Sequence, residues 1–551
     1  MIPVLEVSNL DVLFSVPDGD VHAVKNASFA IGESECLGVV GESGSGKSQL
    51  FLAAAGLLDA NGNATGSVRY RGQEILNIPQ RRLNRLRGAK ITMIFQDPLT
   101  SLTPHMTIGA QIVESLRVHR KMPREEAMRR AADVLEQVRI PEARRRLRQY
   151  PHELSGGMRQ RVMIAMAIVC GPDLLIADEP TTALDVTVQA QILDILRDLR
   201  GELKTAIVLV SHDFGVIAGL ADKVQVMRQG EIVEQGPVER VFYGPENDYT
   251  KMLLAAMPRI DTPLPALPPV GTHLLTVTDL KVSFPIRGNG LFSKTKTLRA
   301  VDGVSFSLAE GETLGIVGES GCGKSTLARA VLQLLPKSAG TVAWLGRDLG
   351  PATRREIQKL RADLQIVFQD PLASLDPRMP IGESIGEPLK ALRPGISSAE
   401  RKTRVREMMD QVGLDPAWIN RYPHEFSGGQ NQRVGIARAM IVEPKLVVCD
   451  EAVSALDVSI QAQIVALIGA LQARTGMALL FISHDLSVVR RISHRVMVLY
   501  LGRIVEMADR NALYADPCHP YTRALLSAAL LPDPRAQRAR PRIKLTGDLP
   551  S

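Results

Sequence analysis

The sequence repeats itself over nearly its whole length, and this duplication constrains the fold more than any other feature. The octapeptide at residues 41–48, GESGSGKS, returns at residues 318–325 as GESGCGKS. Three later motifs return in the same order and at a constant spacing: Ser155-Gly156-Gly157 as Ser427-Gly428-Gly429, Asp178-Glu179 as Asp450-Glu451, and His212 as His484. We therefore expect two copies of one domain in tandem.

Each octapeptide fits a phosphate-binding P-loop. An apolar run before it predicts a buried strand, and the residues after it predict a helix. The glycines let backbone N–H groups point at phosphate oxygens, the lysine reaches the outer phosphates, and the serine can ligate Mg²⁺. An ordinary Gly-rich turn is the alternative, but the strand–loop–helix context favours the P-loop. The candidate residues are Gly41, Gly44, Gly46, Lys47, Ser48 and Gln49, then Gly318, Gly321, Gly323, Lys324, Ser325 and Thr326.

The pattern of elements predicts an α/β fold in each half. We expect one domain at residues 1–257, a linker at 258–272, a second domain at 273–530 and a basic tail at 531–551. Five prolines make the linker a semi-rigid spacer. Short Val/Ile/Leu strands alternate with helical stretches, which indicates a mainly parallel sheet, and roughly the first 40 residues of each half favour a small antiparallel sheet. Charged, helix-periodic segments at 124–150 and 398–422 predict a helical insertion in each half.

Composition excludes several classes of protein. A chain of 551 residues exceeds one core, and its apolar runs are too short to span a bilayer. The formal charge is +7, yet aromatic residues make up only 4% and do not interleave with basic ones, so we expect a solvated basic surface and no nucleic-acid partner. No secretory signal is visible at the N-terminus, and the five scattered cysteines lack metal spacing, which fits a reducing compartment.

The Asp-Glu pairs carry candidate metal and base chemistry. Each pair ends an apolar run that predicts a buried strand, and alternation along a strand would point the two side chains in different directions. Asp178 and Asp450 suit Mg²⁺, which prefers oxygen ligands, while Glu179 and Glu451 suit polarisation of an attacking water. A helix N-cap aspartate beside a surface glutamate is the alternative, and the upstream P-loop makes the catalytic interpretation the stronger one.

The Ser-Gly-Gly motifs predict a second kind of anion site. Each precedes a long helical stretch, so a serine hydroxyl, two glycine amides and a helix N-terminus come together. The candidate residues are Ser155, Gly156 and Gly157 in the first half and Ser427, Gly428 and Gly429 in the second. A simple helix N-cap is the alternative, and chemically it is nearly the same arrangement.

The order of these motifs resembles the nucleotide-binding domain of ABC transporters, over both halves almost end to end. The resemblance implies, in each half, a RecA-like core, an antiparallel β-subdomain and a helical subdomain that bind ATP with Mg²⁺. Gln96 and Gln369 match the family's Q-loop, whose amide can touch Mg²⁺ or the attacking water. His212 and His484 match the switch histidine at the γ-phosphate, with a satisfied core histidine as the alternative. Phe14 and Phe284 occupy matching places for stacking on adenine, with core packing as the alternative.

The resemblance also implies a head-to-tail pairing of the halves, in which each ATP lies between one P-loop and the opposite Ser-Gly-Gly. The first site would combine Lys47, Gln96, Glu179 and His212 with Ser427, Gly429 and Asp457; the second would combine Lys324, Gln369, Glu451 and His484 with Ser155, Gly157 and Asp185. The chain departs from the family pattern at Gln49, Met158, Asn431 and Ala452-Val453. None of these removes a phosphate ligand or a base, so we expect two competent sites.

The ends of the halves point to a subfamily. Residues 517–526, PCHPYTRALL, resemble the C-terminal extension of oligopeptide/dipeptide importer ATPases, and residues 245–254, PENDYTKMLL, are a weaker copy. The fused layout resembles importers of the microcin-C or glutathione type. This implies two permease subunits, a substrate-binding protein and a peripheral position on the cytoplasmic face of the inner membrane. Cys518 alone cannot hold the iron–sulfur cluster of some relatives.

A soluble tandem ABC protein that acts on ribosomes or on nucleic acid is the alternative class. The short proline-rich linker is unlike the long charged linker of the ribosomal class. The DNA-repair class carries zinc-binding cysteine clusters inside its ATPase halves, and the cysteine spacing here offers none.

Overall fold

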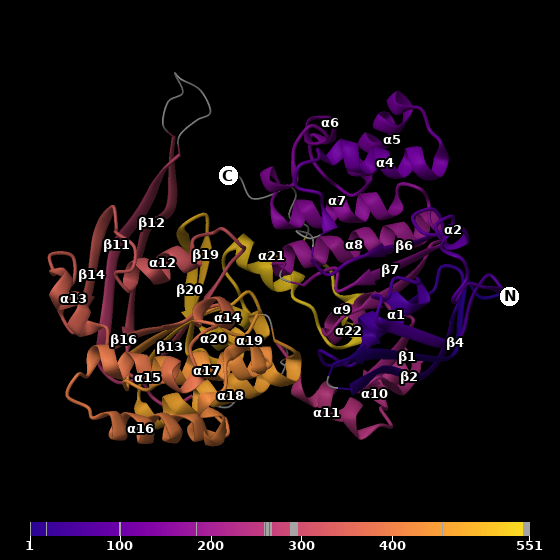
Figure 1. Cartoon of the computed structure of the whole chain (residues 1–551). Coiled ribbons are helices and arrows are strands. Elements are labelled where there is room, and N and C mark those ends of the chain that lie inside the picture. The colour runs from indigo at the N-terminus through magenta and orange to yellow at the C-terminus, as the bar shows by residue number, and fades with distance from the viewer. Residues whose placement is uncertain are drawn as a thin grey trace. The chain divides into compact units, whose positions relative to one another are not determined.

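A computed structural model describes residues 2–17, 19–97, 101–182, 184–257, 259–260, 264, 267–286, 296–454 and 456–543. The chain forms two compact units: the first holds Met1–Met257 together with Leu530–Pro541, and the second holds Pro258–Ala529 with Arg542–Ser551. Part of the predicted linker and residues 544–551 of the predicted tail lie outside the described residues. Both units contain nearly the same order of strands and helices (Figure 1).

The first unit is built on two sheets. A four-stranded antiparallel sheet has the order β2-β1-β4-β5, and a six-stranded sheet has the order β10-β9-β3-β8-β7-β6, in which only β10 runs antiparallel to its neighbour. The strands are β1 (Leu5–Val16), β2 (Gly19–Ile31), β3 (Cys36–Val40), β4 (Gly62–Tyr70), β5 (Gln73–Glu74), β6 (Ile91–Ile94), β7 (Leu174–Asp178), β8 (Ala206–Val210), β9 (Lys223–Arg228) and β10 (Glu231–Pro237).

Some helices of the first unit cover the six-stranded sheet, and others form a separate helical group beside it. They are α1 (Lys47–Ala54), α2 (Gln80–Leu83), α4 (Ile108–Arg120), α5 (Arg124–Gln137), α6 (Ala143–Arg146), α7 (Gly156–Ile168), α8 (Val186–Leu203), α9 (Phe214–Leu220), α10 (Val238–Tyr243) and α11 (Asp248–Ala256), with a 3₁₀ turn at Pro151–Glu153. The predicted helical insertion starts earlier than expected, because α4 packs with α5 and α7 in the same group. The short helix α22 (Pro534–Ala539) also belongs to this unit and packs on α9 (Figure 1).

The second unit repeats this plan. Its sheets have the orders β12-β11-β14-β15 and β16-β17-β18-β13-β19-β20. Its strands are β11 (His273–Ile286), β12 (Lys296–Ala309), β13 (Thr313–Val317), β14 (Ala339–Trp344), β15 (Arg347–Asp348), β16 (Leu364–Val367), β17 (Leu446–Asp450), β18 (Ala478–Ile482), β19 (Arg495–Tyr500) and β20 (Arg503–Asp509). Its helices are α12 (Lys324–Val331), α13 (Arg354–Leu360), α14 (Pro371–Ser374), α15 (Ile381–Leu392), α16 (Ser398–Gln411), α17 (Gly428–Met440), α18 (Val458–Thr475), α19 (Leu486–Ile492), α20 (Arg510–Ala515) and α21 (Pro520–Ala528), with 3₁₀ turns at Pro416–Asn420 and Pro423–Glu425.

The sequence pattern explains why the central strands pair in parallel. Every residue of β3, β7 and β8 is buried, as is every residue of β13, β17 and β18, because helices cover both faces of the sheet. The core of each unit continues from this sheet to the antiparallel sheet through the first helix after the P-loop. This arrangement confirms the predicted fold class. Among the described residues, no helix is both long and apolar enough to cross a membrane.

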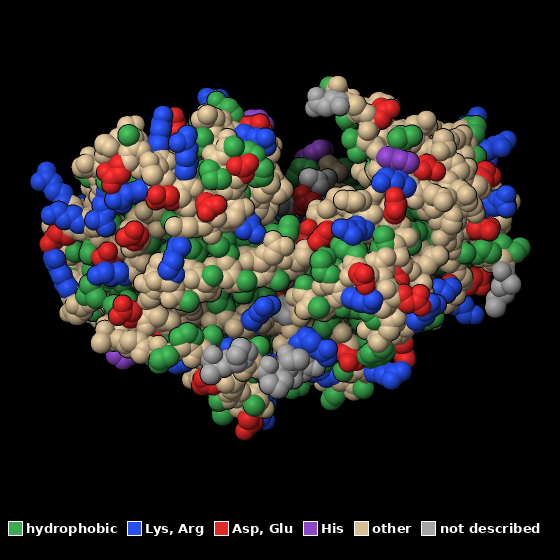
Figure 2. All heavy atoms as spheres, turned by 90° about the horizontal axis from the view of Figure 1, so that it is seen from below, with side chains coloured by type: hydrophobic (Ala, Val, Ile, Leu, Met, Phe, Trp, Pro, Cys, Tyr) green, Lys and Arg blue, Asp and Glu red, His purple; other side chains and the backbone are tan. Residues whose placement is uncertain are grey.

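The surface carries mixed charge. On the face drawn in Figure 2, lysine and arginine side chains alternate with aspartate and glutamate over the described surface. Charges of both signs are therefore mixed on this face, as expected for a solvated surface.

Candidate active sites

The first P-loop links β3 to α1 and takes a backbone path that needs glycine. Gly41 and Gly46 have φ values of 155° and 94°, and a Cβ on either would lie within 2.3 Å of a neighbouring carbonyl oxygen. The Lys47 side chain, which is 6% exposed, folds back so that Nζ donates to the carbonyl oxygens of Gly41 and Glu42, both at 2.8 Å. The lysine charge is thus held at the loop where phosphate would bind.

The second P-loop has the same geometry between β13 and α12. Gly318 and Gly323 have φ values of 150° and 104°. Lys324 Nζ donates to the carbonyl oxygens of Gly318 at 2.7 Å and Glu319 at 3.1 Å. Both loops therefore have the backbone conformation and the lysine position of a phosphate-binding loop. Gln49 and Thr326, which occupy the same position of the two copies, lie in the first turn of α1 and α12.

The serine after each lysine contacts the aspartate at the end of the neighbouring strand. Ser325 Oγ donates to Asp450 Oδ1 at 2.8 Å, and the Ser48 side chain is likewise hydrogen-bonded to the Asp178 carboxylate. Burial raises the pKa of both aspartates above the ordinary value. Asp178 Oδ1 is also a buried oxygen without a hydrogen-bond partner among the described residues. A hydroxyl beside a buried carboxylate oxygen is a donor set that fits Mg²⁺.

The glutamate after this aspartate is not part of the strand. β7 ends at Asp178 and β17 ends at Asp450, and Glu179 and Glu451 have φ values of 48° and 50°. The expectation that simple strand alternation separates the two carboxylates was therefore wrong. A left-handed backbone turn directs each glutamate, and non-glycine residues in this conformation cluster at functional sites.

Each glutamate is surrounded by the glutamine and histidine that the sequence analysis selected. Gln96 Nε2 donates to Glu179 Oε2 at 2.8 Å, and His212 Nδ1 lies 3.2 Å from Glu179 Oε1. In the second unit, Gln369 Nε2 donates to Glu451 Oε2 at 2.9 Å. Three residues from distant parts of the sequence thus meet in each unit, on the carboxyl side of the central sheet.

Polar neighbours keep both glutamates ionised. Burial is the largest influence on Glu179 and would raise its pKa, but hydrogen bonds from His212 and Thr182 and the charge of Lys47 together lower it below the ordinary value. For Glu451 the neighbouring His484 is the largest influence and lowers the pKa. A carboxylate that stays deprotonated next to a P-loop can accept a proton from water.

The two clusters differ in detail. His484 Nδ1 lies 3.9 Å from Glu451 Oε2, which is farther than the 3.2 Å of the first unit. Thr182 Oγ1 donates to the Glu179 carboxylate at 2.8 Å, whereas its counterpart Ser454 donates to the backbone carbonyl of Glu451 at 2.9 Å. Glu451 Oε1 lies 3.9 Å from Lys324 Nζ.

The Ser-Gly-Gly motifs begin α7 and α17, as predicted. Ser155 Oγ accepts from Met158 N, and Ser427 Oγ accepts from Gln430 N, both at 3.3 Å. Gln430 also closes a capping box by accepting from Ser427 N at 2.9 Å, which Met158 cannot do. Asn431 replaces Arg159 and still holds the preceding turn, because its Nδ2 donates to the carbonyl oxygens of Pro423 and Phe426.

The two glycines of each motif have different surroundings. A Cβ on Gly156 or Gly428 would meet nothing within 4 Å. A Cβ on Gly157 would lie 2.6 Å from Val188 on α8, and one on Gly429 would lie 2.7 Å from Ile460 on α18. The first glycine faces open space, while the second allows two helices to pack closely.

The remaining candidate residues are more scattered. Asp185 and Asp457 are the N-caps of α8 and α18. Phe14 is half-buried, and its ring packs against the backbone of Gly62, so its surroundings match the core-packing alternative. Phe284 is 36% exposed on β11. Sequence reasoning missed Tyr249 and Tyr521, whose hydroxyls contact the P-loops; the PYT and DYT motifs were the available signal.

A P-loop beside a buried aspartate, a glutamine, a glutamate and a histidine, present in each of two similar units, defines a P-loop ATPase with a duplicated site. Residues 24–182 and 301–454 match the ABC transporter family, and residues 233–282 and 505–550 match the oligopeptide/dipeptide transporter C-terminal region.

Two curated relatives are similar over the whole chain. Each alignment of 581 residues is 48% identical and covers 100% of this chain and 93% of the relative, which is the glutathione import ATP-binding protein GsiA of Escherichia coli (strain K12) or of Shigella sonnei (strain Ss046). Among solved structures, a dimeric ATP-binding cassette in a post-hydrolysis state with ADP and Pi is 27% identical, with 43% of this chain and 99% of that chain covered and a TM-score of 0.39.

The chain belongs to the ABC transporter family. It is an ATP-binding, ATP-hydrolysing protein with two fused ABC domains of the oligopeptide/dipeptide transporter group, which confirms the resemblance drawn from its motifs. As an import ATPase it associates with the membrane and serves a membrane permease. The alternative class, a soluble ABC protein of ribosomes or nucleic acid, is set aside.

Proposed function

We propose that this chain powers the import of glutathione or similarly small peptides, hydrolysing two Mg²⁺-ATP per closed state. The observation that carries the proposal is 48% identity over the whole chain to glutathione import ATP-binding proteins. Supporting it, the Gln–Glu–His cluster is complete in both units.

We assign a role to each residue of the cluster. Lys47 and Lys324 hold the outer phosphates, and Ser48 with Asp178, and Ser325 with Asp450, hold Mg²⁺. Bound Mg²⁺ would neutralise the charge that develops on the phosphate oxygens. Glu179 and Glu451 accept a proton from the attacking water, which Gln96 and Gln369 orient through their contact with the carboxylate. His212 and His484 lie beside the same carboxylates and sense the γ-phosphate.

Each ATP site is completed by residues of the opposite half. In this proposal Ser427, Gly428 and Gly429 close on the nucleotide at Lys47, and Ser155, Gly156 and Gly157 close on the nucleotide at Lys324. The open space beside Gly156 and Gly428 supports this role, because an approaching phosphate meets no side chain there. ATP then favours the closed state of the two halves and hydrolysis releases it.

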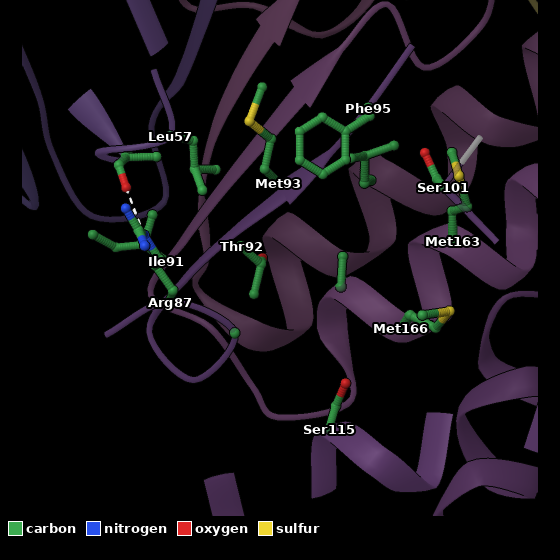
Figure 3. A pocket seen from close by; sticks show the side chains of 14 residues that line it. Leu57, Arg87, Ile91, Thr92, Met93, Phe95, Ser101, Ser115, Met163 and Met166 are labelled. Carbon is green, nitrogen blue, oxygen red and sulfur yellow. Dashed lines mark hydrogen bonds between the residues drawn. The ribbon is translucent and has the colours of Figure 1, made fainter. Parts of the chain in front are cut away.

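An apolar pocket in the first unit is the proposed seat of a permease segment. It has a volume of about 290 Å³ and lies between the end of α1, strand β6 and helix α7. Leu57, Met93, Phe95, Met163 and Met166 line it (Figure 3). Phe95 is 43% exposed and directly precedes Gln96, so an occupant of the pocket would act on the residue that contacts Glu179.

The matching positions of the second unit carry different side chains. Gly435 and Arg438 stand where the first unit has Met163 and Met166, and Arg438 donates to the Ser374 carbonyl at 2.6 Å. A methionine-lined pocket and an arginine-bearing counterpart favour different partners. We infer that two different permease subunits, with a separate substrate-binding protein, complete the importer at the inner membrane.

Uptake measurements test the proposal. Cells that express this chain with its permeases should accumulate labelled glutathione, and the chain should copurify with membranes that contain those permeases. Glu179→Gln Glu451→Gln should abolish uptake without preventing copurification. Equal uptake by the variant and the wild type would overturn the proposed function. Met166→Arg should weaken association with only one of the two permeases, whereas Ser115→Ala on the same rim should not.

A further inference from the structure

The C-terminal extension of each unit reaches the P-loop of the same unit. Tyr249 on α11 accepts a hydrogen bond at 3.3 Å from the backbone N–H of Glu42, the second residue of the first P-loop. Tyr521 on α21 accepts the equivalent bond at 3.2 Å from Glu319 N. The same contact occurs twice, on two independent copies of the domain.

Each tyrosine hydrogen-bonds the P-loop residue whose carbonyl oxygen accepts from the P-loop lysine. The carbonyl oxygen of Glu42 accepts from Lys47 Nζ at 2.8 Å, while the N–H of the same residue donates to Tyr249. The Tyr249 hydroxyl also hydrogen-bonds the Glu42 side chain. In the second unit the Glu319 carbonyl accepts from Lys324 at 3.1 Å. One residue of each loop is therefore held by the lysine on one side and by the tyrosine on the other.

The extension is built to aim the tyrosine. In the first unit, the Glu234 carboxylate accepts from Glu246 N at 2.8 Å and Asn247 N at 3.2 Å, and Asn247 then caps Tyr249 N at 2.9 Å. The second unit uses the same construction, with Glu506 accepting from Cys518 N and His519 N, and with His519 capping Tyr521 N at 3.1 Å.

Packing fixes the rings as well. Tyr249 and Tyr521 are only 5% and 6% exposed. The Arg228 guanidinium lies 4.8 Å over the Tyr249 ring, and the Tyr500 ring lies 4.5 Å from that of Tyr521. Burial raises the pKa of Tyr249 to about 12, so its hydroxyl keeps its proton at neutral pH.

We propose that Tyr249 and Tyr521 are positioning residues of the two ATP sites, and that the C-terminal extension is thereby part of the nucleotide-binding machinery. The proposal rests on the assignment of the P-loop lysines in the proposed function. The tyrosine hydroxyl fixes the loop before ATP arrives, so that the backbone and the lysine need no ordering upon binding. Loss of the hydroxyl removes one acceptor from a loop N–H but leaves the ring packing intact.

Nucleotide titration of the full-length chain tests this. The variants are Tyr249→Phe, Tyr521→Phe and the double variant. Tyr500→Phe is the matched control, since it removes a neighbouring hydroxyl but keeps the ring contact with Tyr521. The probes are Mg²⁺-ATP in a steady-state ATPase assay and a fluorescent ATP analogue in a binding titration.

We expect the double variant to bind nucleotide about two- to tenfold more weakly, the range that one lost neutral hydrogen bond produces. The KM for ATP should rise by a similar factor while kcat changes by less than about twofold, and each single variant should weaken one class of site. The thermal midpoints should match that of Tyr500→Phe. Unchanged affinity and KM in the double variant, or equal effects of Tyr500→Phe, would overturn the proposal.

The Lys47→Ala Lys324→Ala variant separates this result from the site assignment. If the lysine variant loses nucleotide binding and the tyrosine variant does not, the positioning role alone is wrong. If the lysine variant binds normally, the assignment of the P-loops is wrong.

Discussion

At the scale of single residues, each candidate base is held in a left-handed backbone conformation. Glu179 and Glu451 have φ values of 48° and 50°, a conformation that costs on the order of 1–3 kcal/mol for a non-glycine residue. The same glutamates receive hydrogen bonds from Gln96 and Gln369. Side chains this closely held need little rearrangement to meet a water at the γ-phosphate, which is the benefit of positioning.

Neutralising both glutamates should separate binding from hydrolysis. Glu179→Gln Glu451→Gln keeps the shape and the amide contacts but cannot accept a proton, so ATP should bind and steady-state hydrolysis should fall by about 100-fold or more. Phosphate release measures hydrolysis, and retention of labelled ATP on the washed protein measures trapping of the closed state. Hydrolysis at the wild-type rate would contradict the catalytic assignment.

Neutralising Asp178 should stabilise the chain in the absence of nucleotide. Burial raises the pKa of this carboxyl above 3.8, so the folded protein binds its proton more tightly than the unfolded chain does. The free energy of unfolding therefore falls as the pH rises from 3.8 through the raised pKa of the folded state. Asp178→Asn should remove this loss, because the amide does not ionise. We expect the variant to melt at a higher temperature than the wild type at neutral pH without ligand. Mg²⁺-ATP at this site should not raise the melting temperature of the variant further.

Ser43→Ala in the first P-loop provides a control for Asp178→Asn, since it changes the same nucleotide site but leaves the buried carboxylate in place. A ligand-free Asp178→Asn protein that melts below the wild type at neutral pH would contradict the account.

At the scale of elements, the contact of α7 with α8 depends on one glycine. Gly157→Ala would place a Cβ 2.6 Å from Val188, whereas Gly156→Ala meets nothing within 4 Å. Overpacking of this kind costs roughly 1–3 kcal/mol. Gly157→Ala should therefore lower the free energy of unfolding in denaturant titrations, and Gly156→Ala should not. Equal destabilisation by both substitutions would show that the glycines share one role.

Local patterns were sufficient to predict the elements that carry the P-loops. The apolar runs before Gly41 and Gly318 and the helices after them lie within a few residues of the motif, so their physics is local. The left-handed turn at Glu179 was not predicted, because a glutamate gives no signal for a positive φ. The contact of Tyr249 with Glu42 joins positions 207 residues apart, and only the folded chain shows it.

At the scale of the whole molecule, the end of the chain returns to the first unit. In Leu530–Pro541, Asp533 accepts from the Tyr243 hydroxyl at 2.6 Å, and Arg538 donates to the Ala221 carbonyl at the end of α9 at 2.6 Å. Arg535 pairs with Glu239 at 2.7 Å and lowers its pKa. Residues 531–541 are part of the predicted basic tail, because their arginines suggested a solvated surface and the partners of these arginines are distant in sequence.

Removing this segment should loosen α9, the helix that follows His212. Deletion of residues 530–551 takes away the contacts to α9 and α10, so amide exchange at Phe214–Leu220 should accelerate while exchange at Leu486–Ile492 stays unchanged. Deletion of residues 544–551 alone is the control. Protection of α9 that survives the longer deletion would show that the segment does not hold this helix.

The central claim is that each ATP is shared by a P-loop and the Ser-Gly-Gly motif of the opposite half. The most direct test measures how much labelled ATP is retained by the Glu179→Gln Glu451→Gln chain when a second pair of changes is added. Ser427→Arg with Lys47→Ala should damage a single site and leave one nucleotide bound, whereas Ser427→Arg with Lys324→Ala should damage both sites and leave none. The reverse pattern, with one nucleotide retained beside Lys324→Ala and none beside Lys47→Ala, would show that each half completes its own site and would contradict the account.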